Sequence, residues 1–181
     1  PVDAFYVEHD SLRQIERFPY RVVLFPSVMI GQFREEFTED HIYGALLQLG
    51  FTHIFEVEQP IDLLIGKIKD SVGVAENKPA ISSFCPAIVR LIRSKYPSLV
   101  ENILPVKVPH DLAAAFVIDK LTADGIARDE IGIFYVSPCS AKMAAVKRPL
   151  GEEKSVVDGL INMKHLYNRI MQVISKGNAS D

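Results

Sequence analysis

The sequence lacks several features that would assign it to a protein class at once. It has two cysteines and no tryptophan, so a disulfide framework is not the basis of its stability and a reducing cytoplasm is the expected compartment. Its longest strictly apolar stretches, such as residues 112–118, are far shorter than the roughly 20 residues that span a bilayer. The N-terminus has no basic region followed by an apolar one. We therefore expect neither a membrane segment nor a secretory signal.

The sequence also lacks a basic run and the common nucleotide-binding loops. Lysine and arginine are interleaved with aspartate and glutamate, and the formal net charge is -3, which argues against a nucleic-acid partner. No GxGxxG, P-loop or GxSxG motif is present. The five histidines show no HExxH or paired-ligand spacing. Taken singly, each is expected at the surface or at a helix cap.

What remains is the composition of an ordinary globular protein, with 48% apolar and 24% charged residues. A chain of 181 residues is long enough for one domain or two small lobes. It starts at Pro1 without an initiator methionine, so we expect it to be part of a longer protein.

β-branched and aromatic runs predict strands, which fall at residues 20–25, 52–57, 80–84, 131–137 and 156–161.

Amphipathic stretches between these runs predict helices. Thr38 is placed to cap a helix that ends at Gly50, and Asn162 to cap the last one. Pro86 is placed as the first residue of a helix that would bury Ile88, Leu91 and Ile92. The other expected helices cover residues 62–72, 111–124, which stops at Gly125, and 163–176.

Alternating strands and helices predict an α/β fold of mostly parallel sheets flanked by helices in three layers, in Rossmann-like lobes. Prolines at positions 79, 86, 97, 105 and 109 punctuate a central connection. We therefore place a boundary near residues 104–110, between a first lobe of residues 1–107 and a partial second lobe of residues 108–181. Both cysteines should face the cleft between these lobes.

The two cysteines each stand beside a proline at the end of an apolar run, Cys85 before Pro86 and Cys139 after Pro138. Open α/β sheets bind their ligands at such strand ends. A helix N-terminus also favours the thiolate, which is the form that ligates metals. Judged singly, however, such a cysteine is more often a small buried hydrophobe. Two thiolates do not complete a four-cysteine cluster site.

Taken together, the two segments resemble those of a known family, the iron-only (diiron) hydrogenases, in the domain that carries the H-cluster. Ser82-Ser83-Phe84-Cys85-Pro86 is similar to the family's TSCCP segment, and Pro138-Cys139-Ser140-Ala141-Lys142 to its PCxxKxxE segment. The similarity extends from about Arg21 to Met171, in the same order and spacing.

The resemblance implies a role for each matching residue. Cys85 and Cys139 would be ligands of the 4Fe-4S part of the H-cluster, and Lys142 would point its ammonium at a cyanide ligand of the diiron subcluster. Ser27, after Pro26, would offer hydrogen bonds to the other diatomic ligands. Pro138 would also border the cofactor, and so would His110, which stands where the family usually has a glutamine.

Several positions depart from the family pattern. Phe84 replaces a proton-relaying cysteine, Ala145 replaces the glutamate of PCxxKxxE, and Ser137 replaces a methionine. Moving protons to a buried metal needs such carriers, so these changes favour the sensory branch over the high-turnover branch. The third cysteine motif, ExxxCxxGC, does not occur in the chain. We expect these 181 residues to bind no H-cluster by themselves and to be inactive, whatever the enzymatic activity of the full protein.

In the full protein the resemblance implies dihydrogen and protons as substrates, with ferredoxin-type electron-transfer domains or a signalling module as partners. Two other hypotheses stay open. The chain could be a non-catalytic α/β ligand-binding or interaction module with buried structural cysteines, since a fold alone does not decide function. It could also use Cys85 and Cys139 as a redox pair, although they lack the CxxC spacing of dithiol enzymes.

Overall fold

The computed structural model describes residues 10–74, 78–149 and 154–177. Its centre is a four-stranded sheet in which every neighbouring pair is parallel, in the order β2-β1-β3-β4. The strands are β1 (Tyr20–Phe25), β2 (His53–Glu56), β3 (Ile131–Ser137) and β4 (Gly159–Asn162). The sequence predicted β1 and β3 with these limits and β2 one residue too long at each end. The predicted β4 begins three residues too early and ends one residue too early.

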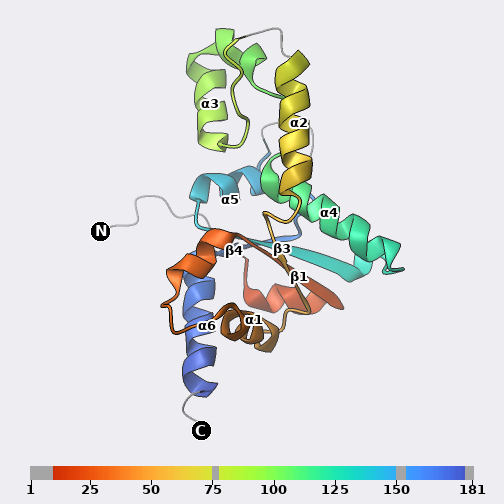
Figure 1. The fold of residues 1–181 in the computed structure, drawn as a ribbon, viewed down its shortest axis with the longest axis vertical. Coiled ribbons are helices and arrows are strands. Elements are labelled where there is room, and N and C mark those ends of the chain that lie inside the picture. The colour runs from red at the N-terminus through yellow and green to blue at the C-terminus, as the bar shows by residue number, and fades with distance from the viewer. Residues whose placement is uncertain (1–9, 75–77, 150–153, 178–181) are drawn as a thin grey trace.

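Helices cover both faces of the sheet, as the three-layer prediction required (Figure 1). The α-helices are α1 (Glu39–Gln48), α2 (Ile61–Val74), α3 (Pro86–Lys95), α4 (Pro109–Ala123), α5 (Ser140–Lys147) and α6 (Met163–Gly177). Short 3-10 helices are η1 (Leu12–Arg17), η2 (Ser27–Gln32), η3 (Pro97–Asn102) and η4 (Arg128–Glu130). The predicted stops at Gly50 and Gly125 are confirmed, because both glycines adopt positive φ, 103° and 89°.

Alternation along the strands creates two separate cores. Val23, Phe25 and Phe134 point to the face that α1 and α6 cover. Their neighbours Val22, Leu24 and Tyr135 point to the opposite face, against α4 and α5. Because successive side chains of a strand alternate between faces, a strand buried on both faces must be apolar at every position. This explains the uninterrupted apolar run of β3, in which all seven residues are buried.

The predicted strand at residues 80–84 is wrong. Only Ile81 makes a β-bridge, to Ile103, through two hydrogen bonds with Asn102 and Leu104. The serines that follow bond backbone groups through their side chains instead: Ser82 Oγ accepts from the nearby Phe84 N–H at 3.3 Å, and Ser83 Oγ donates to the distant Val106 carbonyl at 2.8 Å. Such side-chain bonds compete with a β-ladder, so the segment is irregular.

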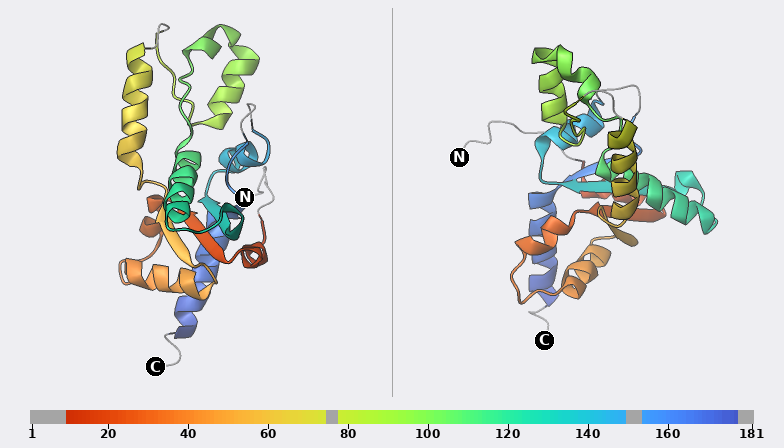
Figure 2. Two further views of the ribbon diagram at one scale, coloured as in Figure 1. Left: turned by 90° about the vertical axis from the view of Figure 1, so that its right-hand side faces the viewer. Right: turned by 45° about the horizontal axis from the view of Figure 1, so that its top comes forward.

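The helix that begins at Pro86 is present, and Ile92 is buried as expected, but the other two apolar residues named for it are not. Val89 and Ile92 are buried, whereas Ile88 and Leu91 are each 45% exposed. Together α2, α3 and η3 stand side by side above the sheet (Figures 1 and 2). A small apolar cluster around Leu64 and Leu104, which also includes Phe84, lies in this upper part.

The sheet crosses the predicted boundary at residues 107 and 108. Strands β1 and β2 come from residues 1–107 and strands β3 and β4 from residues 108–181, yet β1 pairs directly with β3. The two parts therefore share one sheet and its two cores. Their division into separate lobes stays a prediction. In the described part of the chain, no helix has the length and apolar character needed to cross a membrane.

Asn162 caps α6, as the sequence predicted. Its Oδ1 accepts hydrogen bonds from the N–H groups of Lys164, at 3.0 Å, and His165, at 3.3 Å. We expect Asn162→Ala to lower the free energy of unfolding by about 1 kcal/mol, the usual effect of losing an N-cap. Asn162→Asp, the matched control, should keep the stability because its carboxylate caps equally well. Equal stability of the alanine variant and the unaltered protein in urea unfolding would contradict this role.

Candidate functional site

The carboxyl ends of the central strands bring two predicted segments together. Strands β1 and β3 pair in a register that ends with Leu24 opposite Tyr135. Continuing this register places Ser27 level with Pro138, so Pro26-Ser27 and Pro138-Cys139 follow neighbouring strands at the same edge. The strand order shows that β2 lies on one side of this pair and β4 on the other. The edge is therefore the topological switch point, where open α/β sheets bind ligands.

Cys139 is held at this edge by its own backbone. Its N–H donates to Ser137 Oγ at 3.2 Å, and Ser137 is completely buried at the end of β3. Cys139 is the N-cap of α5, and its thiol makes no capping hydrogen bond. The side chain is partly exposed. The thiol is thus presented beside a helix N-terminus, an end that favours negative charge.

Cys85 has a similar local setting but does not follow a strand. It is the N-cap of α3, Pro86 occupies the first turn, and the thiol is exposed without a capping bond. Helices α3 and α5 pack against each other, and Arg90 donates to the carbonyl of Arg148 at 3.2 Å. Both cysteines therefore stand at the N-termini of two contacting helices. Neither is the buried hydrophobe that the interaction-module hypothesis requires, and both are free thiols.

The other predicted residues differ in their surroundings. Pro26 is buried, whereas Ser27 and Pro138 are exposed. The Ser27 N–H donates to Glu58 Oε2 at 3.1 Å, which ties the end of β1 to the segment after β2. Lys142 lies in the first turn of α5 and is partly buried. Its charge acts on His110, which the structure places on the neighbouring helix α4.

His110 is the most buried of the predicted residues that can carry a charge, with 4% of its surface exposed. Its ring stacks on Tyr135 of β3, with centroids 4.6 Å apart and planes inclined by 6°. Burial lowers the pKa of His110, Lys142 lowers it further, and Asp111 opposes both effects. Burial also raises the pKa of Tyr135. His110 is therefore a neutral imidazole near neutral pH.

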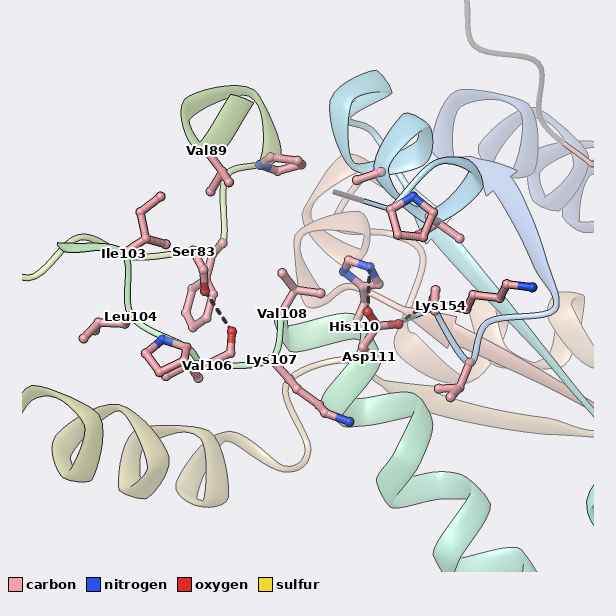
Figure 3. A pocket seen from close by; sticks show the side chains of 18 of the residues that line it. Ser83, Val89, Ile103, Leu104, Val106, Lys107, Val108, His110, Asp111 and Lys154 are labelled. Atoms are coloured by element: carbon pink, nitrogen blue, oxygen red, sulfur yellow. Dashed lines mark hydrogen bonds and ion pairs between the residues drawn. The ribbon is translucent and has the colours of Figure 1, made fainter. Parts of the chain in front are cut away.

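A pocket of about 590 Å³ lies beside these groups, between the upper part and the sheet (Figure 3). His110, Asp111 and Lys154 line it (Figure 3), and so do Phe84 and Ala145, the two positions where the resemblance expects proton carriers. Asp111 Oδ1 accepts a hydrogen bond of 2.5 Å from Ser155 Oγ. No sequence pattern pointed to Ser155 or Tyr135, because only the fold brings Ser155 to Asp111 and Tyr135 to His110.

The donor atoms suit an iron-sulfur cluster in type but not in number. Cysteine thiolates are the usual ligands of such clusters, and a cubane requires four of them. Within residues 10–74, 78–149 and 154–177, no group of three or more histidine, cysteine, aspartate or glutamate side chains is arranged to hold a metal ion. The described residues thus offer two ligands of the right type, on elements that the fold places in contact.

Fold and site together define an α/β protein with an open parallel sheet and two free thiols at helix N-termini near its switch point. Comparison with known families then identifies the family. Residues 21–176 match the family model of the iron only hydrogenase large subunit, C-terminal domain. The chain belongs to this family.

Individual relatives agree with this assignment. Iron hydrogenase 1 of Clostridium pasteurianum is 29% identical over 136 residues, which are 71% of this chain and 24% of that protein. NADP-reducing hydrogenase subunit HndD of Solidesulfovibrio fructosivorans is 28% identical over 118 residues, 59% of this chain and 20% of that protein. The chain therefore spans about a quarter or less of the curated relatives it matches.

Solved structures share the fold. The structure of HydA(deltaEFG), which concerns stepwise assembly of the FeFe-hydrogenase H-cluster, superposes with a TM-score of 0.69 at 22% identity, over 89% of this chain and 45% of that one. A variant of HydA1 from Chlamydomonas reinhardtii gives a TM-score of 0.69 at 21% identity, over 89% and 46% of the two chains. At these identities the match establishes the common fold.

Proposed function

We propose that the chain forms part of the H-cluster domain of an iron-only hydrogenase-like protein, with Cys85 and Cys139 as ligands of a 4Fe-4S cluster. The main support is the position of Cys139, at the carboxyl end of the central strand β3, with its thiol free of capping bonds. Family membership and the contact between α3 and α5 support the pairing with Cys85. The remaining cluster ligands would come from outside the described residues.

The surrounding residues would orient and tune the group. When bound, the H-cluster would supply the metal centre at which dihydrogen is interconverted with protons and electrons. Lys142 is a compact cation with three donors, suited to hold an anionic ligand from its place on α5. Ser27, at the adjacent strand end, would offer hydrogen bonds, while Pro26, Pro138 and His110 would shape the cavity.

We assign the protein to a sensory role with slow hydrogen turnover. Phe84 and Ala145 line the same pocket, and neither a phenyl ring nor a methyl group exchanges protons. Ser137 is fully buried and bonded to the backbone of Cys139, so it is committed to shaping the loop. The pocket wall therefore lacks proton carriers at both positions where the resemblance expects them.

The proposed substrates are dihydrogen and protons, and the partners are ferredoxin-type electron-transfer domains or a signalling module of the full protein. The cytoplasm is the proposed compartment, because cluster ligation requires reduced thiols. Both cysteines are free, which agrees with such an environment.

Anaerobic reconstitution of the full protein with iron and sulfide tests the proposal. We expect cluster absorption in the unaltered protein and its loss, to near the background of the apoprotein, in Cys85→Ala and in Cys139→Ala, because thiolates hold the cluster. Ser140→Ala, next to Cys139 but with both thiols present, is the control and should retain the absorption. Unchanged spectra in both cysteine variants would refute the ligand assignment and favour the non-catalytic module.

A further inference from the structure

We propose that His110 is the proton carrier of this site, taking up and releasing protons between the pocket and the part of the site formed by Cys139 and Lys142. This role rests on the proposed function, because a hydrogen-converting or hydrogen-sensing site must exchange protons. The proposal assigns proton exchange to His110, which stands where the family usually has a glutamine.

The His110 ring is held in place by packing, and its nitrogens make no hydrogen bond to the described residues. Its side chain is 6% exposed and stacks on Tyr135. Its Nε2 lies 4.0 Å from Asp111 Oδ2, which is longer than a hydrogen bond. Among the described residues, the only sealed side-chain nitrogen or oxygen without a partner is Arg21 Nε. The ring nitrogens of His110 are therefore accessible from the pocket that it lines (Figure 3).

Buried polar groups in proteins are nearly always hydrogen-bonded. An imidazole that is more than nine-tenths buried, with nitrogens open to a pocket of about 590 Å³, is placed to bond water or a pocket ligand. Phe84 and Ala145 line the same pocket but exchange no protons. His110 thus provides, on the pocket wall, the chemistry that these two positions lack.

Charged groups face His110 from several elements. Asp111 lies on its own helix α4, Lys142 comes from α5 and Tyr135 from β3. The pocket wall adds Arg93, Lys107 and Lys154. Burial and Lys142 favour the neutral ring, and Asp111 favours the protonated one. The opposing influences of Asp111 and Lys142 allow the ring to change its protonation state without a change of fold.

The proposed transfer is a simple proton exchange. A proton from the Lys142 side of the site binds the lone pair of the neutral ring, which forms an N–H bond and gives the imidazolium. An N–H bond of the imidazolium then breaks, and its proton passes to pocket water or to the Asp111 carboxylate, which restores the neutral ring. No electrons move in this step. The electrons from oxidised hydrogen would leave separately, to an oxidised ferredoxin-type carrier.

Histidine is the pocket residue whose ordinary pKa lies closest to neutrality. A titration followed by NMR of the ring tests this exchange without any cofactor. We expect the pKa of His110 to lie below 6.5, to fall further in Asp111→Asn and to rise in Lys142→Gln. An imidazole that stays neutral down to acid unfolding, or that ignores both substitutions, would overturn the proposal.

Two substitutions in the reconstituted full protein separate proton exchange from packing. His110→Phe keeps a ring that can stack on Tyr135 but has no nitrogens, and His110→Gln keeps hydrogen bonding without titration. We expect both to retain cluster absorption and to lower the rate of hydrogen oxidation at least tenfold, in line with the loss of a general base. The rise of that rate with pH through the His110 pKa should disappear in both.

The possible failures are distinguishable. Full activity in His110→Phe would show that the residue only packs, and would overturn the proton role while leaving the cluster assignment intact. Full activity in His110→Gln would show that hydrogen bonding suffices, and would also overturn it. Absence of cluster absorption in the unaltered full protein would overturn the proposed function and the role of His110 with it.

Discussion

Replacing Phe84 by cysteine together with Ala145 by glutamate is expected to raise hydrogen turnover of the reconstituted full protein by about 100-fold, the lower end of the usual gain from positioned proton carriers. Both residues line the pocket next to His110, so a thiol and a carboxyl group there would add a second route for protons. The measurement is the rate of hydrogen uptake at constant cluster content.

The matched control for this pair combines Phe84→Ala with Ala145→Gln. It makes nearly the same changes in volume but adds no group that exchanges protons. Phe84 packs on the cluster around Leu104 and Leu112, so both double variants should lose about 2 kcal/mol of stability through the missing ring. Equal turnover in the two double variants would refute the explanation of slow turnover by Phe84 and Ala145.

The same background gives a further check on His110. If the added thiol and carboxyl carry protons by their own route, His110→Gln should lower turnover less in the Phe84→Cys, Ala145→Glu protein than in the unaltered one. An equal loss in both backgrounds would mean that the two routes are not parallel.

The largest effect on stability is expected from Phe134→Ala, at about 4 kcal/mol. Phe134 is 1% exposed on β3 and pairs with Gly159 of β4. A Cβ at Gly159 would approach atoms of the Phe134 ring to 2.6 Å, so the ring occupies the space that this glycine leaves open. Phe18 adds an edge-to-face contact with centroids 6.1 Å apart.

Thermal unfolding would measure the effect. For a chain of this length, a loss of about 4 kcal/mol corresponds to a Tm about 10 °C lower. Phe116→Ala is the control, because it makes the same substitution at a more exposed site. Phe116 on α4 is 37% exposed, so removal of its ring should cost less than about 1 kcal/mol of stability. Similar losses in the two variants would mean that the buried ring of Phe134 stabilises the fold no more than the partly exposed ring of Phe116.

Local structure followed closely from the sequence where one signal dominated. The apolar run of β3 has no polar interruption before Ser137, and its limits were predicted correctly. Thr38 and Asn162 carry side chains that cap helices, and both do so. The helical period did not predict that Ile88 and Leu91 are exposed. Helix α3 carries more apolar residues than its buried face holds, and Val89 and Ile92 occupy that face.

The segment at residues 80–84 shows why local pattern can mislead. Its residues suit a strand, but only Ile81 finds a partner, in a single bridge to Ile103. The side chains of Ser82 and Ser83 then bond the backbone of Phe84 and Val106. Strand formation depends on a partner distant in sequence, which periodicity does not report.

The sequence by itself determined the alternating α/β pattern, the caps, and the two cysteines beside Pro86 and Pro138, because these depend on neighbouring residues. Tertiary structure alone decided that β1 pairs with β3 and so aligns Ser27 with Pro138. It also decided that Phe84, Ala145 and His110, far apart along the chain, line one pocket. Pairing of distant strands and burial of His110 against Tyr135 follow from packing of the whole chain, which local preferences cannot specify.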